Sequence, residues 1–146
     1  MENHTDAVFA QSAAIPFRIE KNQPRILLIR NRSNRRWIVP KGIIEEWQTP
    51  EEAAAEEAYE EAGVRGPIVG NSVGSFEYRK WGGVCHVDVY LLRVENELAD
   101  WPEAGFRRRQ WVGVDQALEM VDDNGLKRVI SRARKHIEGG EKREER

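Results

Sequence analysis

Residues 42–64 read GIIEEWQTPEEAAAEEAYEEAGV, a stretch that combines a well-marked helix with an unusual concentration of acid. Thr49 is suited to cap a helix, and a proline follows it at the first helical position. Glu52 stands where it would complete a capping box, and Gly63 is a typical helix stop. The sequence therefore predicts a helix over residues 50–62.

This predicted helix places like charges together. At 100° per residue, its glutamates at 56, 57, 60 and 61 fall within roughly 140° of one side. The pairs Glu56–Glu60 and Glu57–Glu61 each cost about 0.2–0.5 kcal/mol, and no lysine or arginine in the stretch offsets them. One interpretation is a solvated acidic face. The other is a site for Mg²⁺ or Mn²⁺, which prefer oxygen ligands and would remove the repulsion.

Basic residues stand on both sides of the acidic stretch, at 30–41 before it and at 79–80 and 107–109 after it. Cations beside a carboxylate-bound metal are what a polyphosphate substrate needs. The context therefore favours the metal site over the solvated face.

Length and composition indicate one globular domain, predicted over residues 8–138, with 139–146 as a disordered tail. The net charge of −2 argues against nucleic acid as a partner, and no apolar run approaches the roughly 20 residues that a membrane helix needs. Cys85 is the single cysteine, and the N-terminal residues lack a signal-peptide pattern. A cytoplasmic location is expected, and the sequence does not set the oligomeric state.

Hydrophobic patterning predicts the other elements. Strands are expected at 12–18, 25–30, 36–40, 66–78, 84–94 and 107–114, loops at 41–48, 79–83 and 95–106, a short helix at 115–121, and a longer helix after residue 125.

The acidic stretch resembles the Nudix box, whose pattern is G-x5-E-x7-R-E-U-x-E-E-x-G-U, with U a bulky aliphatic residue. Gly42, Glu57, Glu60 and Glu61 fall on its fixed positions, as do the glycine and valine that end the stretch. Ala58 at the aliphatic position is a small departure. The resemblance covers residues 13–130 and implies an α/β/α sandwich with a mixed, partly parallel sheet.

Two departures from the box concern a brace between loop and helix. Gln48 replaces its first glutamate, and Glu56 replaces its arginine. In the family these two side chains hold the loop before the helix against the helix. Either Gln48 hydrogen-bonds Glu56, so that the brace is exchanged rather than lost, or Glu56 joins the metal cluster as an extra carboxylate.

The resemblance also implies the chemistry, which is attack of water on phosphorus in a diphosphate. Glu57 and Glu61 would hold Mg²⁺ or Mn²⁺, and a backbone carbonyl near Gly42 would add a ligand. Glu60 would be a further ligand or the base that activates water, and the sequence does not separate these roles. Glu77 is a weaker candidate for the base.

The flanking segments RWIVPKG, GSFEYRK and LADWPEAGFRRRQWV resemble the branch that hydrolyses diphosphoinositol polyphosphates and diadenosine polyphosphates. By position in that branch, Arg30, Arg32, Lys41 and Arg107 would bind the phosphates of a small phosphoanhydride substrate. Gln11 stands where the branch has a basic residue, which argues against a very highly phosphorylated inositol ligand. Two alternatives remain at this point: a degenerate Nudix module that binds a nucleotide without cleaving it, and an enzyme acting on RNA 5′ ends.

Overall fold

Two long strands that run parallel form the centre of the sheet. The computed structural model describes residues 6–144. Strands β1 (Val8–Glu20) and β7 (Gly83–Arg93) pair in parallel, with Ser12 opposite Asp88 near the middle. Strands β2 (Gln23–Arg30) and β6 (Ile68–Lys80) flank them in antiparallel orientation. The sheet is therefore mixed, as the sequence predicted.

Three short strands complete this sheet, whose order is β3-β2-β1-β7-β6 with β4 paired to β1 and β9 paired to β2. Their bounds are β3 (Trp37–Ile38), β4 (Lys41–Ile43) and β9 (Arg109–Gly113). Two further strands, β5 (Val64–Arg65) and β8 (Asn96–Glu97), form a separate two-stranded sheet.

Strand β4 corrects the expectation of a loop over residues 41–48. Gly42 pairs with Ser12 of β1, a residue thirty positions earlier in the chain. A strand of only three residues that forms through such a distant partner has no local sequence pattern that would predict it. The consequence for function is that the backbone around Gly42 is held by the sheet.

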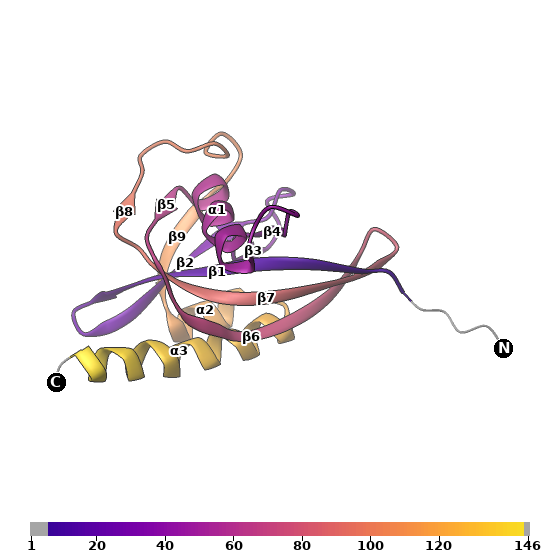
Figure 1. The fold of residues 1–146 in the computed structure, drawn as a ribbon. Helices are drawn as coiled ribbons and strands as arrows, with labels where there is room; N and C mark the ends of the chain where they lie inside the picture. Colours follow the sequence, from indigo (N-terminus) through magenta and orange to yellow (C-terminus); the bar gives the residue numbers. More distant parts are fainter. Residues whose placement is uncertain (1–5, 145–146) are drawn as a thin grey trace.

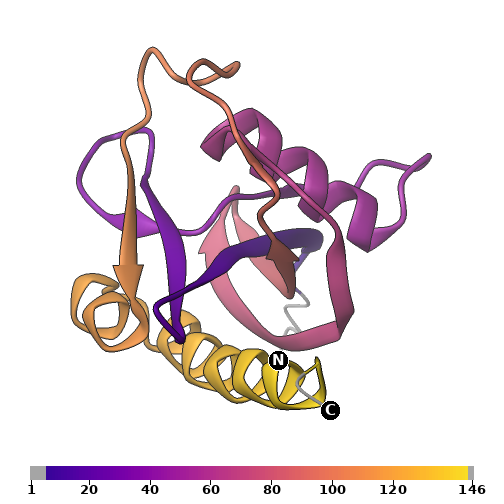
Figure 2. The ribbon, with the colours of Figure 1, turned by 90° about the vertical axis from the view of Figure 1, so that its left-hand side faces the viewer.

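Helices cover both faces of the sheet, which makes the predicted α/β/α sandwich (Figures 1 and 2). Helix α1 (Pro50–Ala62) packs its buried alanines against Leu27, Ile29 and Leu92 on one face. Helices α2 (Val114–Met120) and α3 (Asn124–Glu144) cover the other face. The bounds of α1 match the predicted helix because its start and stop signals are local.

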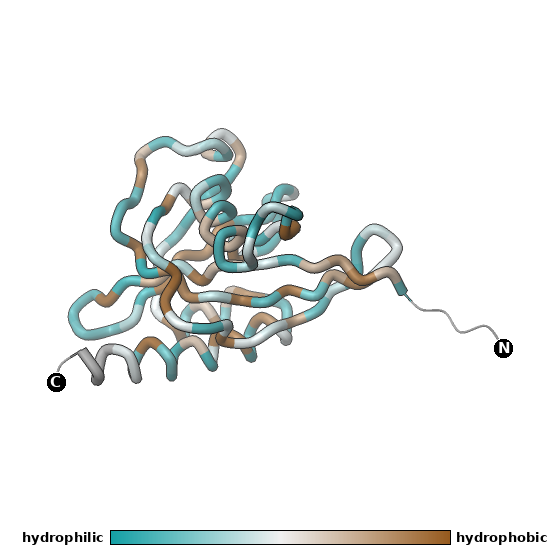
Figure 3. The backbone as a smooth tube through the Cα atoms, in the orientation of Figure 1, coloured by the Kyte–Doolittle hydropathy of each residue, from teal (hydrophilic) through white to brown (hydrophobic). Residues whose placement is uncertain are grey.

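The long helix α3 alternates apolar and polar positions along its length, as the hydropathy colouring in Figure 3 shows. The apolar positions expected from the sequence are all buried: Leu126, Val129, Ile130, Ala133 and Ile137. The helix continues to Glu144, so most of the expected disordered tail is helical; residues 145–146 lie outside the described residues. Within residues 6–144, no helix has the length and apolar character needed to cross a membrane.

Strands β6 and β7 are joined by a two-residue turn, shorter than the loop expected over 79–83. Trp81 and Gly82 have φ angles of +56° and +70°, as the central residues of a type I′ hairpin turn require. A bulky residue in this conformation is rare. Trp81 is 55% exposed, so its ring is presented to solvent on a rigid turn.

Candidate active site

The first turn of α1 is fixed by its own side chains. The backbone N–H of Glu52 donates to the Thr49 hydroxyl over 3.1 Å, and the Thr49 N–H donates to the Glu52 carboxylate over 2.9 Å. This is the predicted capping box, with proline at the first helical position. Because caps fix both ends of α1, they also fix the rotation of the helix about its own axis. That rotation decides the direction in which the four glutamates point.

Glu57 and Glu61 lie together against the backbone of Gly42. A Cβ added at Gly42 would overlap the Glu57 carboxylate, so only glycine permits this approach. Glu61 is 8% exposed, and its carboxylate accepts the N–H of Lys41 over 3.2 Å. Burial, together with the neighbouring Glu61, raises the pKa of Glu57 to about 9. Burial also raises the pKa of Glu61. Without a cation, this environment therefore does not stabilise two negative charges, and the pair keeps a proton at neutral pH.

Glu60 and Glu56 form the more exposed edge of the acidic cluster. The pKa of Glu60 is raised, first by burial and then by the charge of Glu56. The side-chain amide of Gln48 donates a hydrogen bond to the Glu56 carboxylate, and its oxygen accepts the N–H of Glu45 over 3.1 Å. Of the two alternatives that the sequence left open, the structure shows the hydrogen bond of the exchanged brace, with Glu56 exposed at the surface.

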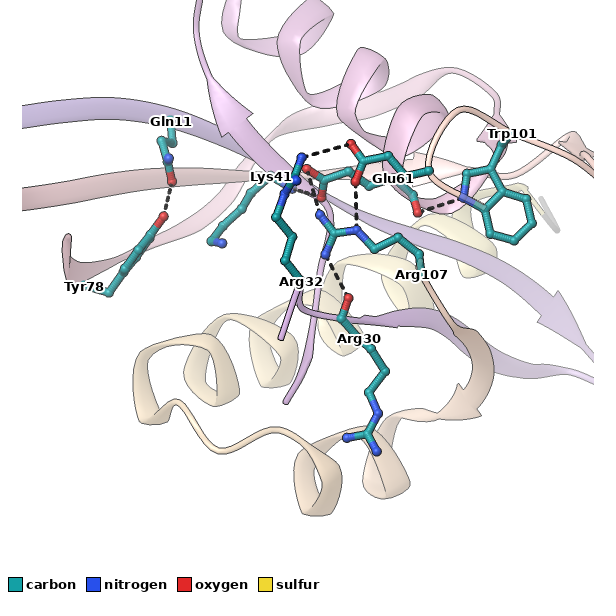
Figure 4. A network of polar contacts seen from close by, with 9 residues as sticks. Gln11, Arg30, Arg32, Lys41, Glu61, Tyr78, Trp101 and Arg107 are labelled. Atoms are coloured by element: carbon teal, nitrogen blue, oxygen red, sulfur yellow. Dashed lines mark hydrogen bonds and ion pairs between the residues drawn. The ribbon is translucent and has the colours of Figure 1, made fainter. Parts of the chain in front are cut away.

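Arg107 is buried and joins the acidic cluster to strand β2 (Figure 4). Its guanidinium donates to the Arg30 carbonyl over 2.8 Å and to the Glu103 carboxylate over 2.9 Å. It also lies 3.6 Å from the carboxylate of Glu61. Arg107, which the sequence predicts as a phosphate-binding residue, therefore also contacts the carboxylate of Glu61.

Lys41 lies between Glu61 and an aromatic ring. Burial lowers the pKa of the Lys41 ammonium, although the charge of Glu61 acts in the opposite direction. Its Nζ is 4.9 Å from the centre of the Tyr78 ring, and the Tyr78 hydroxyl donates to the Gln11 side chain over 2.7 Å. A partly desolvated ammonium at this point suits an anionic ligand.

These groups line one cleft of about 590 Å³. Of the residues predicted for the site, Gly42, Glu57, Glu60, Glu61, Arg32, Lys41 and Arg107 all line it. Sequence reasoning missed Tyr78, Gln11 as a lining residue, Glu103 and the acidic pair Asp122 and Asp123, which reach the cleft from other elements. Tyr78 and Glu103 lie within the flanking segments that carry the family resemblance, but their place beside the glutamates depends on the tertiary fold.

Two candidates are placed elsewhere. The guanidinium of Arg30 lies over the Trp37 ring, 4.8 Å from its centre, and points away from Glu61 in Figure 4. Arg30 therefore contributes its backbone carbonyl to the site, while its side chain does not line the cleft, unlike the other three residues predicted to bind phosphate. Glu77 accepts from His86 over 3.2 Å on the sheet surface and does not line the cleft.

The carboxylates of the cleft fit a divalent metal ion that is bound partly by the protein and partly by the substrate. In the described part of the chain, no three His, Cys, Asp or Glu side chains are arranged to enclose a metal ion. Mg²⁺ is commonly held by one or two carboxylates together with water and substrate phosphates. Half-buried Glu57 and buried Glu61, two carboxylates with raised pKa values beside an open cleft, match that coordination.

The sequence profile of the NUDIX domain matches residues 9–133, which is most of the chain. The chain belongs to the Nudix family. The Nudix box expected at residues 42–64 thus lies within the matched range, with Glu57, Glu60 and Glu61 at its glutamate positions.

Curated relatives place the chain among named Nudix proteins. It is 34% identical over 131 residues to Nudix hydrolase 13, mitochondrial, of Arabidopsis thaliana, covering 75% of this chain and 65% of that protein. It is 35% identical over 113 residues to human diphosphoinositol polyphosphate phosphohydrolase 3-alpha, covering 76% of this chain and 68% of that protein. The chain thus spans about two thirds of the length of these relatives, and only 57% of Nudix hydrolase 16, mitochondrial, of Arabidopsis thaliana.

Solved structures share the Nudix fold. The crystal structure of the C. elegans Ap4A hydrolase superposes with a TM-score of 0.75 at 18% identity, covering 90% of this chain and 99% of that one. The NUDIX domain of Shewanella oneidensis NrtR, in complex with ADP ribose, superposes with a TM-score of 0.71 at 20% identity, covering 91% and 90%. These likenesses confirm the predicted architecture.

Proposed function

We propose that this protein is a metal-dependent pyrophosphohydrolase of the Nudix type. The observation that carries the proposal is the pair of half-buried Glu57 and buried Glu61, whose raised pKa values indicate a place for a cation, beside a cleft lined by Lys41 and Arg107. When bound, Mg²⁺ or Mn²⁺ would neutralise phosphate charge and lower the pKa of water.

The side chains of the cleft divide the remaining work. Lys41 and Arg32 would bind the non-bridging oxygens of the phosphate chain. Glu60 lines the same cleft and would accept the proton of the attacking water. The water oxygen would bond to phosphorus as the anhydride P–O bond breaks, and the leaving phosphate would keep the bridging oxygen.

The substrate class proposed is a dinucleoside polyphosphate or a diphosphoinositol polyphosphate. The human relative named above is a diphosphoinositol polyphosphate phosphohydrolase, and a protein of the same fold is an Ap4A hydrolase. The cations along the cleft suit a chain of phosphates, which both ligands carry.

A degenerate module that binds without cleaving is the alternative, motivated by Gln48 and Glu56. The hydrogen bond between these two side chains argues against it, because the loop remains attached to the helix. All three glutamates predicted for the chemistry also line the cleft. Hydrolysis is therefore the better-supported function.

The test is turnover of diadenosine and diphosphoinositol polyphosphates with Mg²⁺ or Mn²⁺ at mildly alkaline pH, with products resolved by chromatography. In ¹⁸O-labelled water, one product phosphate should carry the label. Glu57→Gln should abolish turnover, whereas Glu51→Gln, an exposed glutamate in the first turn of the same helix, should not. Binding of these compounds without cleavage under any metal condition would support the degenerate module instead.

A further inference from the structure

The end of α1 and its capping residue Gly63 present four backbone carbonyls that the helix itself does not satisfy. All four accept hydrogen bonds from one segment, residues 98–109, which we name the strap. The acceptors and donors are Glu60 O from Glu103 N (3.1 Å), Glu61 O from the Trp101 indole (3.0 Å), Ala62 O from the Arg109 guanidinium (2.9 Å) and Gly63 O from Leu98 N (2.8 Å). The strap therefore holds the backbone of the glutamates, and two of its own residues, Glu103 and Arg107, also line the cleft.

Trp101 and Arg109 make one unit within the strap. The Arg109 guanidinium lies over the Trp101 ring, 3.9 Å from its centre, and donates to the strap's own Leu98 carbonyl over 2.6 Å. A Cβ at Gly63 would come within 2.7 Å of both side chains, so the glycine that ends α1 also leaves room for them. Neither Trp101 nor Arg109 lines the cleft.

The charge of Arg109 compensates for a deficit in α1. The helix has no basic residue in its last turn, where the dipole is negative and where Glu60 and Glu61 add negative charge. A guanidinium bonded to the carbonyl of Ala62 supplies positive charge at that end. The carboxylate of Glu61 is held by the N–H of Lys41 and by Arg107, which is itself a strap residue, so the strap contacts both the backbone and the side chain of Glu61.

We propose that Trp101 and Arg109 are positioning residues for the site: they set the backbone of Glu60 and Glu61 so that the glutamate side chains meet metal and substrate correctly. The inference rests on the proposed function. It differs from that function in assigning a role to side chains that touch neither metal nor substrate. Displacing the last turn by a fraction of an ångström would separate Glu61 from Glu57 while leaving the cleft and its cations in place.

Two variants test this role. Trp101→Phe keeps an aromatic ring but removes the indole N–H, and Arg109→Lys keeps the positive charge but removes the planar guanidinium that donates to several carbonyls at once. Trp111→Phe is the matched control. Trp111 also donates its indole N–H to a carboxylate (Glu97, 2.9 Å) and lies under an arginine (Arg18, 4.1 Å). The same Glu97 oxygen lies 3.7 Å from Arg109 Nε, so this control removes a neighbouring indole N–H while every hydrogen bond of the strap to the α1 carbonyls stays in place. Each protein is measured for Mn²⁺ binding by calorimetry, for amide hydrogen exchange over residues 57–64 without metal, and for kcat and KM.

We expect Trp101→Phe and Arg109→Lys to weaken Mn²⁺ binding about 10-fold and to lower kcat similarly, with KM unchanged at saturating metal. Amide exchange over residues 57–64 should quicken in both and stay unchanged in Trp111→Phe. Variants that match the wild type in Mn²⁺ binding and kcat would overturn the inference while leaving the hydrolase proposal intact. A wild type that neither binds Mn²⁺ nor cleaves a pyrophosphate would overturn the proposed function itself, and the inference with it.

Discussion

The side-chain amide of Gln48 donates a hydrogen bond to the carboxylate of Glu56 and so joins the loop before α1 to the middle of the helix. The Gln48 oxygen accepts the N–H of Glu45 in the same loop. A neutral donor thus meets a charged acceptor where the family pattern has two opposite charges. Both ends of the loop are held, because β4 pairs with β1 on one side and Gln48 binds α1 on the other.

Restoring the family's residues at this brace should change activity little. The double variant Gln48→Glu with Glu56→Arg replaces one hydrogen-bonded pair with another, so kcat/KM should stay within about threefold of the wild type. The single change Gln48→Glu should lower activity, since it sets two carboxylates against each other. Steady-state kinetics on all three proteins would test this. A large gain in the double variant would mean that the natural brace impairs the enzyme.

The metal-free protein should lose stability as the pH rises. Burial raises the pKa of Glu57 from 4.5 to about 9, so the folded state binds a proton that the unfolded state releases. The resulting stabilisation is complete below pH 4.5 and is lost as the pH approaches 9. Urea unfolding with a chelator, followed from pH 5 to pH 8, should show this decline. The range stops at pH 8 because Lys41, whose pKa is lowered, acts in the opposite direction in alkali.

Two further proteins separate Glu57 from the rest of the cluster in that experiment. Glu57→Gln cannot ionise, so its stability should depend less on pH than that of the wild type. Glu51→Gln, on the exposed first turn, should follow the wild-type curve. An equal slope in Glu57→Gln and wild type would mean that Glu57 ionises normally in the folded protein.

Arg107 should matter for stability as well as for phosphate binding. Its guanidinium is buried beside buried Glu61 and half-buried Glu103, so Arg107→Ala removes the cation that both carboxylates share. We expect a loss of about 3 kcal/mol in the free energy of unfolding. Arg107→Lys should lose less of the free energy of unfolding, because it keeps the positive charge although it lacks the planar guanidinium. Arg108→Ala, at an exposed neighbour, should change stability by less than about 0.5 kcal/mol.

Sequence and structure agree where the determining interactions are local. Helix α1 begins at Pro50 and ends at Ala62 as predicted, because its cap and its glycine stop lie next to it in sequence. The glutamates follow from that helix and from their spacing. The features that the sequence did not predict depend on partners far away in the chain. Strand β4 forms because it pairs with β1, and Glu103 reaches the site because its N–H binds the end of α1.

Arg30 illustrates the same limit within a strand. It ends β2, and its backbone pairs with Trp37 of β3. That pairing places its guanidinium over the tryptophan ring and away from the cleft. Resemblance identified a basic strand end near the phosphates, but the direction of one side chain is set by its cross-strand neighbour.

Trp81 offers a way to separate the two substrate classes. Its exposed ring lines the cleft from the β6–β7 turn, supported by the edge of Phe9 with ring centres 5.4 Å apart. Lys80 Nζ lies 4.7 Å from the centre of the Trp81 ring, which brings a cation beside the aromatic surface. A nucleoside base could stack on this ring, whereas an inositol ring has no aromatic face. Stacking of a base on an aromatic side chain contributes about 1–3 kcal/mol.

Trp81→Ala should therefore raise KM for a diadenosine polyphosphate roughly 10-fold and leave KM for a diphosphoinositol polyphosphate unchanged. Trp81→Asn is the structural control: it suits the positive φ at this turn and should raise the free energy of unfolding by about 1 kcal/mol, yet it should show the same KM increase. Equal effects on both substrates would mean that Trp81 shapes the rim of the cleft and does not bind a base.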